Sequence, residues 1–230
     1  MPKSIAIIGA GIAGLVTGCY ARMNGYDTLI VEQHDRPGGL CTAWTRHGYT
    51  VDGCIHHLAG CDSSSYLARI WRELGPIAGR PILFRDRLVS IEDHTGQRYD
   101  VLTDIDRLEE HLLTLSPADR GRIVAFTGAA RRLLGCDLLS AMAGGRAEQL
   151  RLLARANTLL RWGRKTMQGY GEGFQSPFLR RAFPLAQYGF PGIPVLIHLN
   201  FLAGCHRRDL GWPHGGSLAF ARALERRYRD

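Results

Sequence analysis

The order of apolar and polar positions is clearest over the first forty residues. A continuous apolar run over 4–8 stops at a glycine, as expected of a strand buried in a parallel sheet. A helical period follows over 12–24, and Gly25 can end that helix. A second apolar run over 27–31 leads into the acidic residue Glu32. This order predicts a β-α-β unit with two parallel strands, and hence an α/β fold.

The pattern changes near residue 60. The stretch 34–65 is rich in Gly, Cys, His and Ser, and it is expected to form loops and short extended pieces. Either Ser63 or Ser64 can cap the next helix, which Gly75 ends. The apolar face predicted for this helix consists of Leu67, Ile70, Trp71 and Leu74.

A strand pair and two helices are predicted in the middle of the chain. Residues 87–93 and 97–102 are expected to form strands on either side of a turn. Asp104 can cap the helix that follows, and Ser116 begins a capping-box sequence with proline at the first helical position. We expect that second helix to run towards Leu134.

The last third of the chain is basic at first and then rich in glycine, proline and aromatic residues. Residues 146–165 form a basic amphipathic segment in which leucines are interspersed with arginines. Glycine, proline and aromatic residues dominate 169–213. A last helix is predicted over 217–229, with an apolar side made of Leu218, Ala221, Leu224 and Tyr228.

Charge is divided unevenly between the two halves. The formal net charge is +8, with −3 over residues 1–115 and +11 over residues 116–230. A basic half can face an anionic lipid surface, a nucleic acid or a phosphate-bearing cofactor. An arginine-rich solvent face is the simpler interpretation. The basic residues form no recognisable nucleic-acid-binding module, so nucleic acid is not an expected partner.

The cysteines and the N-terminus indicate a cytoplasmic protein. None of the six cysteines forms a C-x-x-C pair, so the sequence predicts no metal site. The chain opens with M-P-K-S and passes directly into the first predicted strand, without the pattern of a secretory signal. No apolar run is long enough to span a bilayer. We therefore expect reduced thiols in the cytoplasm.

Three glycines carry the main chemical signal. They stand at G-x-G-x-x-G spacing between the first predicted strand and helix, which is the context that a dinucleotide-binding fingerprint requires. Gly9 allows a tight turn, Gly11 lets the backbone approach a pyrophosphate, and Gly14 lets the helix pack closely on the sheet. The helix N-terminus adds N–H groups and a partial positive charge. The predicted site comprises Gly9, Ala10, Gly11, Ile12, Ala13 and Gly14.

Glu32 is the predicted ribose ligand. It follows Gly14 by 18 residues and ends the second strand. A carboxylate there can accept hydrogen bonds from both ribose hydroxyls of an adenosine, and it would repel a 2′-phosphate, which disfavours NADP. Gln33, next to it, is included in the predicted site.

A second glycine motif follows as D-R-P-G-G-L over 35–40. Its backbone at Gly38 and Gly39 can approach a second part of a dinucleotide, and Arg36 can add positive charge beside the pyrophosphate. Leu40 closes the predicted cofactor site. A plain turn with a surface arginine is the alternative interpretation.

These motifs resemble the N-terminus of the FAD-dependent amine oxidase and phytoene desaturase superfamily. Three later stretches are similar to its carotenoid branch, which includes phytoene desaturases, carotenoid isomerases and retinol saturase: 48–60, 177–183 and 212–218. The resemblance implies FAD as cofactor. It also implies hydride transfer between a hydrophobic, polyene-like substrate and the flavin, or an isomerisation that uses reduced flavin.

The resemblance also implies a domain arrangement. Residues 1–60 are expected to form a Rossmann-like FAD-binding unit, 61–212 part of an α+β substrate domain, and 213–230 a helix that returns to the FAD domain. Members of the superfamily run well beyond this length. We therefore expect either a truncated chain, a non-catalytic FAD- or ADP-binding fragment, or one half of a split enzyme whose C-terminal half is a partner. An NAD-dependent dehydrogenase is disfavoured by the motif over 36–39.

No catalytic side chain is predicted, because the flavin would supply the difficult chemical step. His56 and His57 can transfer protons, although ordinary loop histidines are the simpler interpretation. Asp52 has no evident partner in the sequence. The spacing of Cys41, Cys54 and Cys61 matches no metal site, so we interpret them as small apolar residues.

The basic segment over 146–165 is the one candidate for membrane contact. A basic helix with an apolar face can lie on an anionic membrane surface, which would suit an enzyme of lipophilic substrates. The alternative is a helix packed on the substrate domain with its arginines in solvent. The pattern of leucines and arginines fits both a helix on a membrane surface and a helix on the substrate domain.

Overall fold

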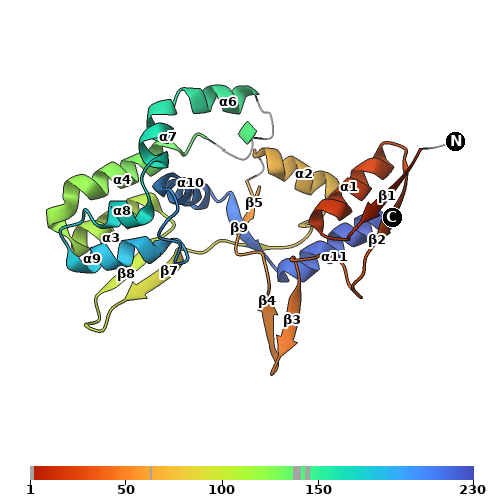
Figure 1. The fold of residues 1–230 in the computed structure, drawn as a ribbon, viewed down its shortest axis with the longest axis horizontal. Helices are drawn as coiled ribbons and strands as arrows, with labels where there is room; N and C mark the ends of the chain where they lie inside the picture. Colours follow the sequence, from red (N-terminus) through yellow and green to blue (C-terminus); the bar gives the residue numbers. More distant parts are fainter. Residues whose placement is uncertain (1–2, 63, 137–140, 143–145) are drawn as a thin grey trace. The chain divides into compact units, whose positions relative to one another are not determined.

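The computed structural model describes residues 3–62, 64–136, 141–142 and 146–230 (Figure 1). The chain divides into two compact units. The first consists of residues 1–83 and 211–230, and the second of residues 84–210. The boundary expected near residue 60 lies at residue 83 in this division, because the helix after residue 65 packs within the first unit.

The first unit contains the predicted β-α-β arrangement. Strand β1 (Ser4–Ile8) pairs in parallel with β2 (Asp27–Val31), and α1 (Ile12–Met23) connects them. Ile5, Ile7 and Ile30 alternate towards the covered face of this two-stranded sheet. The Rossmann-like α/β prediction is confirmed in this part of the chain.

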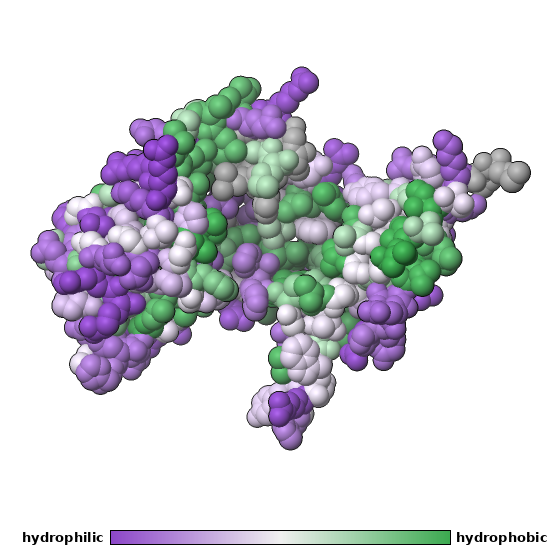
Figure 2. All heavy atoms as spheres, viewed as in Figure 1, coloured by the Kyte–Doolittle hydropathy of each residue, from purple (hydrophilic) through white to green (hydrophobic). Residues whose placement is uncertain are grey.

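The prediction that both strands are buried is wrong for one face of the sheet. Ile8 is 95% exposed, and Leu29 and Val31 are also exposed. Figure 2 shows apolar atoms gathered over β1 and β2. Alternate residues of a strand point to opposite faces, and α1 lies on one face only, so an apolar row is left on the other.

Short strands occupy the region expected to hold loops and extended pieces. Strands β3 (Ala43–Arg46) and β4 (Tyr49–Asp52) form an antiparallel hairpin. Its turn has positive φ at His47 (50°) and Gly48 (81°), the backbone geometry that suits two-residue hairpin loops. A separate three-stranded sheet has the order β5-β9-β6. Its strands are β5 (Leu58–Ala59), β9 (Leu210–Pro213) and β6 (Ile82–Leu83).

Helix α2 (Tyr66–Leu74) begins one residue later than expected. Its cap is Ser65, whose Oγ accepts a hydrogen bond from the Ala68 N–H at 3.2 Å. Ser64 is therefore not the cap, and Ser63 lies outside the described residues. The helix ends at Gly75 in the left-handed conformation (φ 72°), as predicted.

Helix α11 (Gly216–Arg229) packs against α1 and completes the core of the first unit. The predicted apolar side is correct for Ala221, Leu224 and Tyr228, but the largest buried side chain of this helix is Phe220. The ring of Phe220 meets Trp71 edge-to-face at 5.3 Å. Burying an aromatic or leucine side chain fully contributes about 1.5–3 kcal/mol. The core of this unit consists of Ala10, Leu15, Cys19, Leu58, Leu74, Phe220 and Leu224.

The second unit begins with the predicted hairpin of β7 (Arg87–Glu92) and β8 (Arg98–Leu102). Helix α3 (Ile105–Leu115) follows, and the carboxylate of Asp104 caps it by accepting the N–H groups of Asp106 and Arg107 at 3.0 Å. This cap was predicted from the sequence and is confirmed.

The Ser116 capping box does not form. A 3₁₀ turn, η1 (Pro117–Asp119), precedes α4 (Arg120–Arg132), and the Ser116 hydroxyl donates to the Asp119 carboxylate instead. That carboxylate also accepts the N–H groups of Gln175 and Ser176. A contact between segments far apart in sequence therefore replaces the local cap.

The basic segment forms two helices, α6 (Arg146–Leu153) and α7 (Ala156–Gly163). The region rich in glycine and aromatic residues folds into short helices, namely α8 (Met167–Gly171), α9 (Pro177–Ala182) and η2 (Phe183–Ala186), followed by α10 (Val195–His206). Most of its aromatic residues enter the core of this unit, where Phe126 touches the rings of Trp162, Tyr170, Phe183 and His198.

Candidate nucleotide-binding site

The first glycine motif forms a turn between β1 and α1. The Gly9 N–H donates to the Val31 carbonyl at 2.7 Å, and φ at Gly9 is 97°. Gly11 is the N-cap residue of α1, and no side chain caps this helix. A Cβ at Gly14 would lie 2.1 Å from the Gly9 carbonyl oxygen, whereas a Cβ at Gly9 or Gly11 would meet no atom within 4 Å. The turn is therefore tight on its inner side and open on the side where a pyrophosphate could approach.

The second glycine motif lies directly against the first. The Gly38 N–H donates to the Ala10 carbonyl at 2.8 Å. Gly38 also forms an isolated parallel β-bridge with Gly11. Both glycines of this motif have positive φ, 119° at Gly38 and 58° at Gly39. A Cβ added to Gly39 would lie 3.4 Å from the Gly11 Cα. The two motifs thus meet through the backbone of Gly11, Gly38 and Gly39.

Glu32 stands at the edge of this surface. Its Oε2 accepts the Ala10 N–H at 2.7 Å and its Oε1 accepts the His34 N–H at 3.0 Å. These backbone hydrogen bonds, first from His34 and then from Ala10, lower the pKa of the Glu32 carboxyl. A carboxylate has about four acceptor positions, so each oxygen keeps capacity for a further donor such as a ribose hydroxyl.

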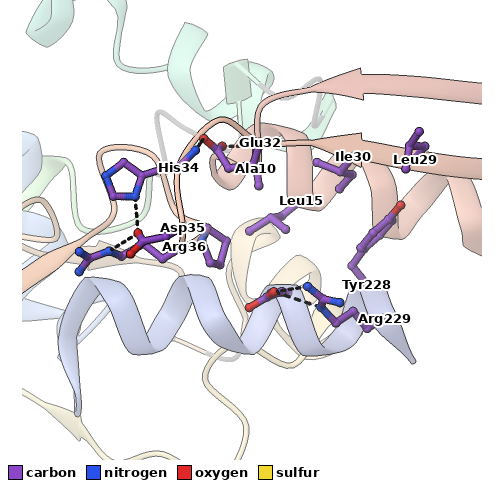
Figure 3. A pocket seen from close by; sticks show the side chains of 12 residues that line it. Ala10, Leu15, Leu29, Ile30, Glu32, His34, Asp35, Arg36, Tyr228 and Arg229 are labelled. Carbon is purple, nitrogen blue, oxygen red and sulfur yellow. Dashed lines mark hydrogen bonds and ion pairs between the residues drawn. The ribbon is translucent and has the colours of Figure 1, made fainter.

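Two cavities open around Glu32. The first has a volume of about 320 Å³ and the second about 310 Å³. Figure 3 shows the first, which is lined by Ala10 and Leu15, by residues from β2 and the loop after it, and by side chains of α11. Residues that line both cavities are Glu32, His34, Arg36 and Pro37.

Arg36 lines both cavities, and its guanidinium donates to residues outside the first glycine motif. Its Nε donates to the Asp35 carboxylate at 3.2 Å, and its Nη1 reaches the Ala43 carbonyl at 3.5 Å. His34 Nδ1 lies 2.6 Å from the same Asp35 oxygen. The hydrogen bond from Arg36, followed by that from His34, lowers the pKa of Asp35.

The other residues predicted for the cofactor site do not all line the two cavities. Gln33 lines the second cavity together with Gly39. Ile12 and Ala13 form the first turn of α1. Leu40 is 85% exposed and lines neither cavity.

Three residues of α11, which the sequence did not assign to the site, line the first cavity: Glu225, Tyr228 and Arg229. The Tyr228 hydroxyl donates to the Thr28 carbonyl at 2.9 Å and lies 3.2 Å from the Thr28 Oγ1. Arg229 pairs with Glu225 at 2.8 Å. The predicted apolar side of this helix included Tyr228, but only tertiary structure brings it to the edge of β2.

Asp52 has a partner that the sequence did not indicate. Its carboxylate accepts the Ser217 N–H at 2.7 Å and also the Ser217 hydroxyl. The Cys54 N–H donates to the same carboxylate at 3.2 Å, and the Ile55 N–H donates to the Ser217 Oγ at 2.8 Å. Partial burial raises the pKa of Asp52, but the hydrogen bonds from Ser217 and the backbone outweigh it and lower the pKa. Asp52 therefore anchors the β3–β4 hairpin to the N-terminus of α11 as an anion.

The histidine pair adds no side chain to the two cavities. His57 is half-buried, and burial, followed by the neighbouring His56, lowers its pKa. Among the described residues, no three or more His, Cys, Asp or Glu side chains cluster as metal ligands would. Over the same residues, no helix combines the length and apolar character needed to cross a membrane.

The family comparison agrees with this geometry. Residues 7–74 match the family described as NAD(P)-binding Rossmann-like domain. The chain therefore contains a Rossmann-like nucleotide-binding domain, built on the turn that Gly9, Gly11 and Gly14 form.

Proteins related in sequence indicate which class of nucleotide-binding protein this is. The phytoene desaturase (lycopene-forming) of Pseudescherichia vulneris is 24% identical over 240 residues, which cover 99% of this chain and 47% of that protein. The chain thus spans about half the length of this relative. It carries the nucleotide-binding domain of the FAD-dependent oxidoreductases and is related to the phytoene desaturases, which confirms the resemblance found in the sequence.

Solved structures share the fold. Putrescine oxidase matches with a TM-score of 0.54 and 14% identity, over 100% of this chain and 50% of the other. RAB GDI from Plasmodium falciparum matches with a TM-score of 0.54 and 13% identity, over 100% and 57%. Because an oxidase and a protein of another description match equally well, the fold by itself does not define a reaction.

Proposed function

We propose that this chain binds the ADP part of FAD and serves hydride transfer between the flavin and a hydrophobic, polyene-like substrate. The observation that carries the proposal is the contact of the two glycine motifs beside Glu32. Gly38 donates to Ala10, and Gly39 lies beside Gly11. A single Rossmann turn suits many dinucleotides, whereas the added glycine pair is the feature that the resemblance links to FAD.

The pyrophosphate would lie at the N-terminus of α1. The open space in front of Gly9 and Gly11 lets an anion approach the backbone, and the uncapped first turn presents N–H groups and the positive end of the helix dipole. Arg36 would complete the charge balance by turning from Asp35 towards the phosphates.

The adenosine ribose would bind at Glu32. Its carboxylate is held in place by two backbone N–H groups, so it is ordered before a ligand arrives. A 2′-phosphate would meet this anion at short range, and the site therefore favours FAD over NADP. The cavities on both sides of Glu32 leave room for the adenine.

Bound FAD would supply the hydride chemistry, and this chain's residues would bind and orient it. The residues named above would hold the adenosine and pyrophosphate end of the cofactor. We assign no catalytic side chain, and we propose isomerisation with reduced flavin as a variant of the same scaffold.

The test compares three nucleotides by calorimetry on the full chain: FAD, ADP and ADP carrying a 2′-phosphate. We expect FAD and ADP to bind and the 2′-phosphate to weaken binding at least about tenfold. Glu32→Gln is expected to weaken ADP binding about tenfold, because a neutral amide accepts the ribose hydrogen bonds less strongly. The matched control is Glu92→Gln, at an exposed position of β7. Equal affinity for ADP and its 2′-phosphate would contradict the role of Glu32.

A second candidate is that the chain acts as one half of a two-chain flavoprotein. The exposed apolar face of β1 and β2 favours this candidate, because Ile8, Leu29 and Val31 offer a surface that a further polypeptide can cover. We propose that the occupant is a polypeptide equivalent to the part of the phytoene desaturases that this chain does not match.

The test of that candidate uses the unmatched part of the Pseudescherichia vulneris enzyme as a separate chain. Size-exclusion chromatography with light scattering should detect a complex with this protein. We expect Ile8→Glu to abolish the complex, whereas Val124→Glu, an exposed position of α4, should leave it intact. A complex that tolerates both substitutions would rule out the β1–β2 face as the contact.

A further inference from the structure

Two cysteines face each other at the base of the β3–β4 hairpin. Ala43 stands opposite Asp52 in the ladder. The Gly53 N–H donates to the Thr42 carbonyl at 2.8 Å, so the pairing continues one step beyond the strands. The next pair in this register is Cys41 and Cys54.

This register suits a disulfide. Residues directly opposite in an antiparallel pair have Cα atoms about 4.5–5.5 Å apart, within the range of about 4.4–6.8 Å that disulfides require. The two thiols interact directly, and burial together with the Cys54 thiol raises the pKa of Cys41 to about 12. Both side chains are partly exposed, so a small reagent can reach them.

The other cysteines differ from this pair. Cys19, Cys136 and Cys205 are buried. Cys61 is partly exposed, and its thiol donates to the Leu58 carbonyl at 3.2 Å. Cys61 is therefore a suitable control for a partly exposed thiol.

We propose that Cys41 and Cys54 form a reversible disulfide that controls the nucleotide-binding loop. The oxidant is a small-molecule disulfide of the glutathione class. The Cys54 thiolate attacks one sulfur of the reagent, forms a mixed disulfide and releases one reagent thiol. Cys41 then loses its proton and attacks the Cys54 sulfur, which releases the second reagent thiol. Two protein thiols are oxidised to one disulfide, and the reagent gains the two electrons and two protons.

The same disulfide forms whichever thiol attacks first, because the two cysteines stand opposite each other in the hairpin register. The mixed disulfide at Cys54 brings an electrophilic sulfur next to Cys41, where the short distance favours the second step.

The disulfide would act on the second glycine motif. The Cys41 N–H donates to the Gly38 carbonyl at 2.9 Å, and the Gly38 N–H donates to Ala10 of the first motif. At the other end, Cys54 lies next to the Asp52–Ser217 anchor. A covalent link would hold the loop over 38–41 in its present contact with Gly11. This effect rests on the proposed function, and we expect ADP to bind several-fold tighter to the oxidised protein, because less ordering remains at binding.

The test treats the full chain with glutathione redox buffers of increasing oxidised fraction. Thiol titration counts the free cysteines, and non-reducing peptide mapping identifies linked ones. The same treatment is applied to Cys41→Ser, Cys54→Ser and Cys61→Ser. We expect a Cys41–Cys54 linked peptide in the wild type and in Cys61→Ser, and its loss in the other two. The wild-type peptide map decides the linkage even where a variant folds poorly.

Three results would overturn the proposal or part of it. Stable glutathione adducts without an internal link, or a link that involves Cys61, would overturn the disulfide. A Cys41–Cys54 link with unchanged ADP affinity would overturn the control of nucleotide binding. If neither redox form binds ADP, the proposed function fails, while the peptide map still decides the disulfide.

Discussion

Gly14 shows how a single residue sets the geometry of the nucleotide turn. Its missing Cβ leaves room for the Gly9 carbonyl, which would lie 2.1 Å from that carbon. The sequence predicted this role from spacing alone, because G-x-G-x-x-G between strand and helix already implies a close approach of helix and turn.

We predict that Gly14→Ala lowers the free energy of unfolding by about 1–3 kcal/mol, because backbone atoms must shift to accept the methyl group. It should also weaken ADP binding. The matched control is Gly128→Ala in α4, where an added Cβ meets nothing within 4 Å and alanine should stabilise the helix by about 0.5–1 kcal/mol. Chemical denaturation measures the free energy of unfolding of both variants. A Gly14→Ala protein as stable as wild type would contradict the packing argument.

Other contacts of single residues could not be predicted. The Asp52–Ser217 anchor joins positions 165 residues apart, and no local pattern encodes such a pair. The hydrogen bond from the Ala10 N–H to the Glu32 carboxylate likewise forms only because β1 and β2 lie side by side. Sequence patterns specify which residues can donate or accept, whereas the partner is set by tertiary structure.

At the scale of elements, helices and strands with a strong local sequence pattern were predicted well, and those with a weak pattern were not. The β-α-β unit and the Asp104 cap have continuous apolar runs or a cap residue at the right place. The β3–β4 hairpin has four-residue strands, and its turn depends on positive φ at His47, which the sequence did not reveal.

The break between α6 and α7 also has a tertiary cause. The Arg155 side chain turns back to donate to the carbonyls of Arg132 at 2.7 Å and Arg151 at 3.0 Å. These bonds satisfy the ends of two helices at once. A periodicity of leucines and arginines over 146–165 cannot show where such a turn occurs.

We propose peripheral membrane contact for the apolar side of these two helices. Leu150, Leu153 and Leu160 are exposed, and Figure 2 shows apolar atoms along α6 and α7. Vesicles that contain an anionic phospholipid should bind the wild type in a flotation assay and bind Leu150→Glu/Leu153→Glu much less. Val124→Glu serves as the control. Equal flotation of wild type and double variant would argue against this surface.

The core of the second unit predicts a pH dependence. His198 in α10 is fully buried, its Nδ1 lies 2.6 Å from the Gln187 Oε1, and burial lowers its pKa to about 4. Between pH 6.5 and about 4 the unfolded chain binds a proton there that the folded chain does not, so stability falls as pH falls. The loss amounts to about 3 kcal/mol across this window.

Denaturation across that pH range measures the effect. The slope of stability against pH should flatten in His198→Phe, whereas His47→Asn should leave it unchanged. His47 is exposed with positive φ, which asparagine tolerates. An unaltered slope in His198→Phe would show that other groups cause the acid sensitivity.

At the scale of the whole molecule, the chain has two compact units and spans about half the length of the phytoene desaturase that it matches. The fold class could be predicted, because the fingerprint occurs in its full β-α-β context. The exposed face of β1 and β2 could not, since a continuous apolar strand looks the same whether one face or both are covered. That face is why we propose a second polypeptide beside the nucleotide site.

Binding of FAD at the turn between β1 and α1 is tested most directly by the visible absorption spectrum of the purified full chain, recorded after incubation with excess FAD and desalting. We expect flavin bands that survive desalting in the wild type and are lost in Gly11→Val, whose side chain would occupy the open space in front of α1. Gly128→Ala should retain the bands. A colourless wild-type protein, or equal retention of flavin by Gly11→Val, would contradict the assignment of this turn to FAD.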